Sequence, residues 1–243
     1  MNRALVLLLS QSYNYSLMMA MEEQSFLGCI LTKSMSAFLI SFDGIDGCGK
    51  STQILLLGDW LKSLGQPSRM VREPGGTALG EALRDILLHR SEIALNPTAE
   101  MLMYMASRAQ LVREVIEPAL ASGQHVIADR YLLASVVYQG CAGGLEPATI
   151  WAVGQVATGG RNPDLTFILD IDPQTAQSRL SGTPDRMESR GIDYMQQVRD
   201  GYLEQIRVLG DRCLVLDARK SIAEIHSAVI DAVRKHLKID TVV

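Results

Sequence analysis

The feature that most constrains this chain is a glycine-rich segment, Gly44-Ile45-Asp46-Gly47-Cys48-Gly49-Lys50-Ser51. It matches the pattern G-x-x-x-x-G-K-[ST] at every fixed position. A short apolar run, Phe38 to Phe42, precedes it, and apolar residues at helical spacing from Ile54 to Leu64 follow it until Gly65 and Pro67. The segment therefore joins a predicted strand to a predicted helix, which is the setting of a phosphate-binding loop.

The residue types in this loop fit the binding of a polyphosphate. Glycines let backbone N–H groups curl around phosphate oxygens, and the helix N-terminus adds partial positive charge. Lys50 is expected to reach the β and γ oxygens, and the Ser51 hydroxyl is a ligand for Mg²⁺. A plain glycine turn that caps a helix is the alternative. The loop predicts the binding of a nucleoside triphosphate with Mg²⁺ by Gly44, Ile45, Asp46, Gly47, Cys48, Gly49, Lys50, Ser51 and Thr52.

Further along the chain, short apolar runs alternate with helical patterns, which is typical of β-α-β units. The predicted strands are Phe38–Phe42, Ser68–Arg72, His125–Ala128, Leu165–Leu169 and Cys213–Leu216. Helices are expected over Leu79–Leu87, from Asn96-Pro97 to Leu120 with a bend at Pro118, and over Ile222–Leu237. The fold class is therefore α/β, a P-loop NTPase-type three-layer fold with a five-stranded parallel sheet flanked by helices.

Composition narrows the function classes. The 243 residues are 47% hydrophobic and carry a net charge of −4, so no broad basic field exists for a nucleic-acid polymer or a membrane surface. The four cysteines and four histidines are scattered, which excludes a disulfide scaffold and a histidine-ligated metal. We expect a cytoplasmic protein whose partners are small molecules.

The first 34 residues carry none of these motifs, and the apolar run Ala4 to Leu9 is too short to span a bilayer. Three interpretations stay open: a mis-assigned start with Met35 as the true first residue, a disordered N-terminal extension, and a targeting peptide. We expect the functional domain to span residues 35–243.

Size and motif content favour a small-molecule kinase over other P-loop proteins. The sequence lacks the N-K-x-D motif of a GTPase and the second site of a mechanical ATPase. A kinase needs a second anion site at the carboxyl ends of the strands, where open α/β sheets bind ligands. Arg72 and Arg130 each follow a predicted strand, and Ser181 to Gly191 has the composition of an exposed loop or small lid.

Several motifs in order and spacing now resemble one family. They are F-D-G-I-D-G-C-G-K-S-T-Q (42–53), R-E-P-G-G-T (72–77), D-R-Y with Y-Q-G (129–140), D-R-M-E (185–188) and V-R-D-G-Y (198–202). This set is similar to the thymidylate kinase (dTMP kinase) family from about Met35 to Leu237. The resemblance implies transfer of the ATP γ-phosphoryl group to dTMP, giving dTDP and ADP for dTTP biosynthesis, by an enzyme that is usually a homodimer.

The resemblance also implies roles for individual residues. Asp46 would hold the sugar 3′-hydroxyl and, with Ser51, help to place Mg²⁺. The remaining dTMP-binding residues would be Arg72 and Arg130 on the phosphate, Tyr104 stacked on thymine, Arg108 on a base carbonyl, Ser135 at the base edge, Tyr138 against a 2′-hydroxyl and Gln139 beside the nucleoside. Relatives often have Glu at the position of Asp43, Phe at that of Tyr104 and Ser at that of Ala134. The motifs therefore predict phosphoryl transfer more directly than they predict selectivity for the base.

The acceptor phosphate needs no general base, because its second pKa of about 6 makes it mostly a dianion at pH 7. Catalysis then depends on holding two polyanions in line and neutralising charge, with Lys50, Arg130, Asp46 and lid arginines as the catalytic set. Gly47 leaves the loop without a basic residue, so the resemblance points to Arg186 and Arg190, with Arg179 behind them. Another nucleoside monophosphate kinase and a nucleotide-binding regulatory module without turnover are the alternatives.

Overall fold

A computed structural model describes residues 37–181 and 185–238. Its five strands are β1 (Leu39–Asp43), β2 (Ser68–Arg72), β3 (His125–Asp129), β4 (Leu165–Asp170) and β5 (Cys213–Asp217). All four strand pairings are parallel and the order is β2-β3-β1-β4-β5. The predicted five-stranded parallel sheet is confirmed. The interpretations of residues 1–34 concern a segment outside the described residues.

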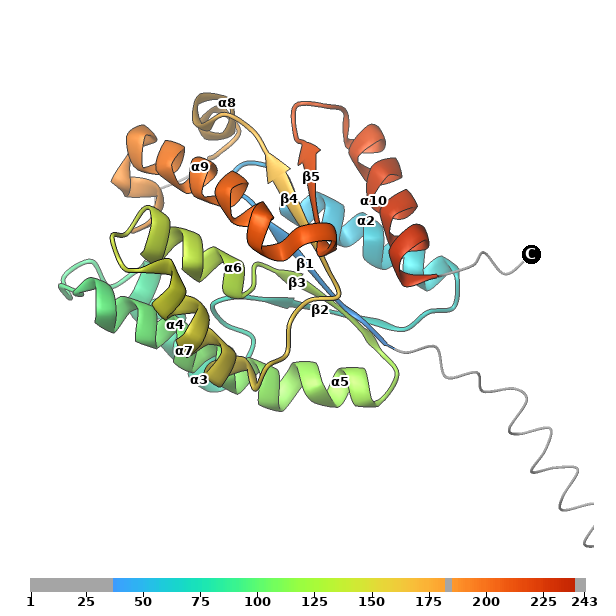
Figure 1. Cartoon of the computed structure of the whole chain (residues 1–243), viewed down its shortest axis with the longest axis horizontal. Coiled ribbons are helices and arrows are strands. Elements are labelled where there is room, and N and C mark those ends of the chain that lie inside the picture. Colours follow the sequence, from blue (N-terminus) through green and yellow to red (C-terminus); the bar gives the residue numbers. More distant parts are fainter. Residues whose placement is uncertain (1–36, 182–184, 239–243) are drawn as a thin grey trace, which may run out of the picture. The chain divides into compact units, whose positions relative to one another are not determined.

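Helices cover both faces of this sheet (Figure 1). The α-helices are α2 (Lys50–Ser63), α3 (Ala78–Leu88), α4 (Pro97–Leu111), α5 (Glu117–Ala121), α6 (Leu132–Ser135), α7 (Pro147–Thr158), α8 (Pro173–Ser178), α9 (Ile192–Leu209) and α10 (Ile222–Leu237). Two π-helical segments, η1 (Val112–Ile116) and η2 (Val136–Cys141), and two 3₁₀ turns, η3 (Glu188–Arg190) and η4 (Gly210–Arg212), complete the elements. Helices α2 and α10 pack together on one face, and α4, α5, α7 and α9 lie on the other.

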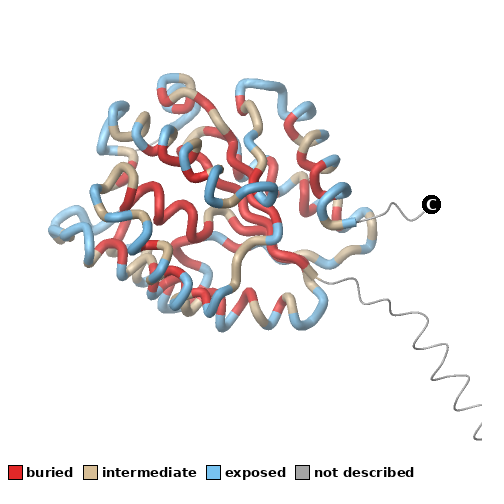
Figure 2. The backbone as a smooth tube through the Cα atoms, in the orientation of Figure 1, coloured by how far each residue is buried: buried red, intermediate tan, exposed pale blue. Residues whose placement is uncertain are grey.

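The central strand β1 is buried along its whole length, as Figure 2 shows for the middle of the sheet. Ile40 and Phe42 pack with Leu57 of α2, whereas Leu39 packs in a separate cluster with Leu111 of α4. This alternation follows from the period of two in a strand, and burial on both faces explains the continuous apolar run in the sequence.

The register of the strands sets the position of the functional loops. Phe42 of β1 pairs with Asp129 of β3, and Arg72 of β2 pairs with the same residue from the other side. The segment after β1, the segment after β2 and the end of β3 therefore meet at one edge of the sheet, where ligands of parallel sheets bind.

The predicted long helix begins at Asn96, whose Oδ1 accepts a hydrogen bond of 2.8 Å from the Ala99 N–H. The chain stays helical through α4, η1 and α5 to Ala121. The π-helical turns of η1 come directly before Pro118, which has no N–H to continue the regular hydrogen-bond pattern.

The predicted lid packs more closely than its composition indicates. Within its described part, residues 185–191, Met187 is buried in the main core cluster. The helices α7, α8 and α9 are further elements that the sequence analysis did not predict. No helix within residues 37–181 and 185–238 has both the length and the apolar character needed to cross a membrane.

Candidate active site

A cavity of about 780 Å³ opens at the carboxyl edge of the sheet. Its walls come from the P-loop, from the segments after β2 and β3, from α4 and η2, and from the residues before α9 and α10. Eight side chains predicted to bind dTMP line this one cavity: Asp46, Arg72, Tyr104, Arg108, Arg130, Ser135, Tyr138 and Gln139. Of the predicted ATP-binding residues, Asp46 to Thr52 line it as well, whereas Gly44 and Ile45 do not.

Three glycines shape the P-loop. Gly44, Gly47 and Gly49 have φ angles of 132°, 82° and 96°, which side chains of L-residues rarely tolerate. A Cβ atom on Gly47 would lie 2.2 Å from the carbonyl oxygen of Ala176 in α8. The close approach of α8 therefore excludes any side chain at the one loop position where a basic residue would otherwise supply charge.

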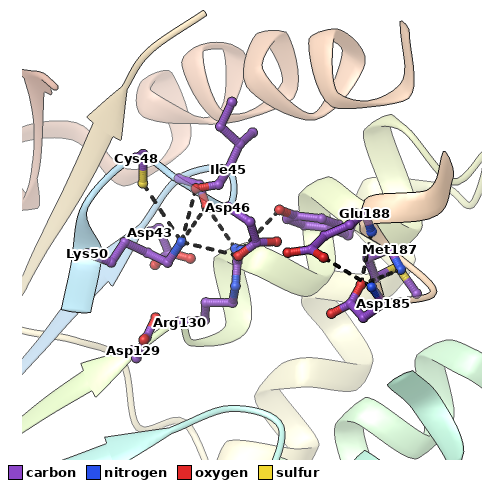
Figure 3. A network of polar contacts seen from close by, with 12 residues as sticks. Asp43, Ile45, Asp46, Cys48, Lys50, Asp129, Arg130, Asp185, Met187 and Glu188 are labelled. Carbon is purple, nitrogen blue, oxygen red and sulfur yellow. Dashed lines mark hydrogen bonds and ion pairs between the residues drawn. The ribbon is translucent and has the colours of Figure 1, made fainter. Parts of the chain in front are cut away.

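Lys50 is 6% exposed and lies at the centre of the loop (Figure 3). Its Nζ donates to the carbonyl oxygens of Gly44 at 3.2 Å and Ile45 at 3.1 Å, and lies 3.7 Å from Oδ1 of Asp46. Gly44 and Ile45 thus contribute to the site through their carbonyl groups, which hold the ammonium group of Lys50. A phosphate group can replace these carbonyl oxygens as the acceptor for Lys50.

Arg130 lies between the P-loop and Tyr202 of α9, and Figure 3 shows its side chain beside Asp46. It donates to Asp46 Oδ1 and the Gly44 carbonyl at 2.8 and 2.9 Å, and to the hydroxyls of Tyr138 and Tyr202 at 3.1 and 3.0 Å. Burial alone would raise the pKa of Asp46, but Arg130 and Lys50 outweigh it and lower the pKa to about 2. Asp46 is therefore ionised and fixed beside the loop.

Asp43 is a second, fully buried carboxyl at this edge. Burial raises its pKa to about 7, although Arg130 and Lys50 act in the opposite direction. Its Oδ1 accepts a hydrogen bond of 3.3 Å from Tyr202, and its Oδ2 has no hydrogen-bond partner within the described residues. The sequence analysis assigned no function to this group.

Ser51 donates to Oδ2 of Asp129 at 3.5 Å. A hydroxyl and a carboxylate at this place are oxygen ligands of the kind that Mg²⁺ prefers. In the described part of the chain, no group of three or more His, Cys, Asp or Glu side chains could hold a metal ion alone. Asp129 was not predicted as a site residue, because only the pairing of β3 with β1 brings it to the P-loop. The available sequence signal was an acidic residue at the end of a predicted strand.

The wall opposite the loop is polar and buried. Arg108 of α4 is 2% exposed and forms an ion pair of 2.6 Å with Glu73, whose pKa is raised by burial against the effect of Arg108. Arg108 also donates to Oγ of Ser135 at 3.0 Å, so the Ser135 proton is free for another acceptor. Tyr104, one turn earlier on α4, presents its ring to the same cavity.

Arg72 at the end of β2 and Arg84 of α3 differ in their contacts. Arg72 pairs with Glu81 of α3 at 3.0 Å and its side chain is 57% exposed. Arg84, which the sequence analysis missed, donates to the Pro74 carbonyl at 2.8 Å and also lines the cavity. It is the one arginine within α3, and that is the signal by which it could have been found.

The predicted lid arginines do not line the cavity. Arg186 donates to the carbonyl oxygens of Ile86, Arg90 and Ile93 at the end of α3. Arg190 forms an ion pair of 2.9 Å with Glu100 of α4. Arg179 does line the cavity, and its guanidinium donates to the Ala218 carbonyl at 3.1 Å. The catalytic role of Arg186 and Arg190 stays a prediction, since each would have to exchange these partners for a phosphate.

Beyond the P-loop, the cavity continues along a group of residues of which only Arg179 was predicted to take part in the site. Arg179, Lys220 and Ile222 line this end, and buried Gln53 donates to the Ile222 carbonyl at 3.1 Å. Ser221 and Glu224 form a capping box that starts α10 here. The S-x-x-E pattern was the available sequence signal.

Comparison with known proteins gives a consistent assignment. The thymidylate kinase family profile matches residues 42–229. A thymidylate kinase of Caldanaerobacter subterraneus subsp. tengcongensis is 44% identical over 205 residues, which cover 84% of this chain and 98% of that protein. Those of Thermoanaerobacter sp. (strain X514) and Rhodopirellula baltica are 42% and 43% identical, covering 84% and 79% of this chain and 100% and 78% of their own lengths. A P-loop and an arginine-lined second subsite in one cavity agree with this match, and the chain belongs to the thymidylate kinase family.

Proposed function

We propose that the cavity binds ATP and dTMP with the P-loop between them and aligns the γ-phosphoryl group with the dTMP phosphate. As a member of the thymidylate kinase family, the chain transfers phosphate from ATP to dTMP, giving dTDP and ADP. The observation that carries the arrangement is the single cavity that contains both the P-loop and the predicted dTMP side chains.

On the phosphate side, Lys50 and Arg130 neutralise charge as the phosphoryl group moves. Both cations already lie beside Asp46. Asp46 orients them and offers its remaining oxygen to the sugar 3′-hydroxyl. Arg72 grips the dTMP phosphate after exchanging its exposed contact with Glu81. No side chain has to remove a proton from the acceptor, because the phosphate monoester is mostly a dianion at pH 7.

On the base side, Tyr104 stacks on thymine, and Arg108 and Ser135 donate to its polar edge. Arg108 suits this role because the sulfur of Met105, at 3.1 Å, is the only hydrogen-bond acceptor of its Nη1 among the described residues. A thioether is a weak acceptor, so this nitrogen keeps donor capacity for a base carbonyl. Tyr138 closes the sugar side, where its ring lies 4.9 Å from the guanidinium of Arg130.

The oxygen atoms beside the loop fit Mg²⁺. Ser51 and Asp129 lie within 3.5 Å of each other, and the side chain of Asp46 is 32% exposed. Mg²⁺ is usually held by one or two protein oxygens together with substrate phosphates, which agrees with the absence of a complete ligand set in the described residues. We assign Ser51 and Asp46, together with Asp129, as its holders. The ion would neutralise charge on the phosphates.

The proposal also covers the arginines of the lid, the oligomeric state and the location in the cell. Arg186 and Arg190 are the predicted catalytic arginines of the lid, with Arg179 as the one that already lines the cavity. We also propose a homodimer, as the family resemblance implies, and a cytoplasmic location, which the four scattered cysteines favour.

The experiment is a coupled assay of ADP release with dTMP, dUMP, dCMP, dGMP and UMP as acceptors. We expect a clear preference for dTMP, followed by dUMP. Preference for another acceptor would indicate a different nucleoside monophosphate kinase. ATP binding without ADP release would indicate a regulatory module that has lost turnover.

A further inference from the structure

Glu100 of α4 lies behind the cavity wall without lining it. Its side chain is 5% exposed. Oε2 accepts a hydrogen bond of 2.9 Å from Nη2 of Arg190, and Oε1 accepts one of 2.9 Å from Nε2 of Gln139. One buried carboxylate therefore joins the segment before α9 to a residue of the cavity wall.

This contact decides which end of the Gln139 amide is available to a ligand. An ionised carboxylate only accepts hydrogen bonds, so only the NH₂ group of Gln139 can face it. Nη2 of Arg190 donates to the other oxygen of the same carboxylate at 2.9 Å, so both carboxylate oxygens act as acceptors. Gln139 is 3% exposed and lines the cavity, and its Oε1 has no hydrogen-bond partner among the residues that the structure describes. The atom that Gln139 can offer to a ligand is therefore a carbonyl oxygen.

A hydrogen-bond acceptor at this position would distinguish thymine from cytosine. The same wall holds Arg108, and in the part of the chain that the structure describes the donor Nη1 of Arg108 has only the Met105 sulfur as partner. Thymine presents an N3–H donor beside carbonyl acceptors, so it matches one acceptor and one donor in the wall. Cytosine presents an N3 acceptor beside an NH₂ donor, so a fixed carbonyl of Gln139 would face an acceptor.

We propose that Glu100 is a positioning residue for base selection. Its carboxylate, balanced by Arg190, holds the Gln139 amide so that the carbonyl oxygen can accept the N3–H of dTMP. The inference rests on the proposed placement of the base against Arg108. It also links base selection to the segment that carries Arg190. Tyr194, in the first turn of α9, accepts from Arg190 at 3.1 Å and donates to the Tyr138 carbonyl at 2.8 Å, next to Gln139.

The test is the variant Glu100→Gln, which keeps the shape of the side chain but introduces an amide that can meet either end of Gln139. We expect KM for dTMP to rise and the ratio of kcat/KM for dTMP over dCMP to fall about tenfold, the effect of one hydrogen bond. The kcat for dTMP and KM for ATP should stay within about threefold of wild type. Glu117→Gln is the control for loss of a glutamate–arginine ion pair away from the cavity, because Glu117 pairs with Arg161 at 2.7 Å, is 38% exposed and does not line the cavity.

A double-mutant cycle with Gln139→Ala separates positioning from general packing. If Glu100 acts through Gln139, Glu100→Gln does not change the dTMP to dCMP ratio further in the Gln139→Ala background. An equal change in both backgrounds, or a ratio for Glu100→Gln within about twofold of wild type, would overturn the proposal. If turnover of a variant is too slow to measure, the dissociation constants of dTMP and dCMP for the same four proteins provide the double-mutant cycle.

Two further readouts keep the test decisive. If Glu100→Gln does not fold, Arg190→Gln removes the counter-ion from a position that is 31% exposed, and an unchanged ratio again refutes the link. Wild-type turnover of dTMP decides the proposed function by itself, so its failure is distinguishable from a failure of the positioning role.

Discussion

Gly47→Ala tests whether the P-loop is shaped by the approach of α8. Gly47 has a φ of 82°, and its missing Cβ would lie 2.2 Å from the Ala176 carbonyl oxygen and 2.9 Å from the carbonyl carbon. The backbone strain costs about 1–2 kcal/mol, and relieving the overlap by moving α8 costs a further 1–3 kcal/mol or so. The expected total is therefore roughly 2–5 kcal/mol of unfolding free energy.

The assay is thermal unfolding, with Gly65→Ala as the control. Gly65 has a φ of 70° and no atom within 4 Å of the position of its Cβ, so this variant carries the strain without the overlap. For a domain of this size, about 1 kcal/mol lowers the Tm by about 2–4 °C. We expect the Tm of Gly47→Ala to fall by roughly 5–20 °C and by clearly more than that of Gly65→Ala. Equal losses in the two variants would refute the role of α8.

Three further predictions concern charged groups. Lys50→Ala should abolish turnover while leaving the Tm near that of wild type, because it removes charge stabilisation; activity within about tenfold of wild type would contradict this. Arg186→Ala and Arg190→Ala should lower kcat much more than KM for dTMP if either supplies lid charge; steady-state kinetics with unchanged kcat in both would move that charge elsewhere. For Asp43, the folded pKa of about 7 lies above the reference value of 3.8, so ionisation lowers stability as the pH rises between these values, by at most about 4 kcal/mol. Denaturant unfolding at pH 5 and pH 8 should therefore show a smaller loss of stability for Asp43→Asn than for wild type, and equal losses would exclude this titration.

The three inner strands, β1, β3 and β4, were predictable because they are buried on both faces and so read as continuous apolar runs bounded by turn residues. The edge strands β2 and β5 are partly exposed and were predicted from the alternation of strands and helices along the chain. The boundaries of β2 agree with the prediction at both ends, Ser68 and Arg72. Helix α9 was not predicted because Gly201 and several charges interrupt its pattern. A Cβ on Gly201 would lie 2.7 Å from the Cβ of Cys141, so the glycine allows α9 to approach η2 closely. The low helix propensity of glycine argues against a helix at this position, although tertiary packing requires the glycine.

The candidate site likewise has a part that could be predicted from local sequence and a part that depends on tertiary packing. The P-loop and the residues of the recognised motifs could be assigned from sequence, because a fixed spacing carries the chemistry. The partners of long side chains could not, since the direction of an arginine depends on which carbonyl or carboxylate lies within reach. Arg186 and Arg190 both lie in the predicted lid, yet one ends at the carbonyls after α3 and the other at Glu100.

These partners explain how a chain with a net charge of −4 can accommodate two polyanions. Three of the cavity cations already have a carboxylate acceptor: Lys50 and Arg130 share Asp46, and Arg72 is bound by Glu81. An arginine held this way loses less conformational freedom when a phosphate arrives, and the carboxylates repel phosphates that are not placed to displace them. Selectivity for a correctly placed substrate therefore depends on the acids that orient the cations, and a whole-chain charge count does not detect it.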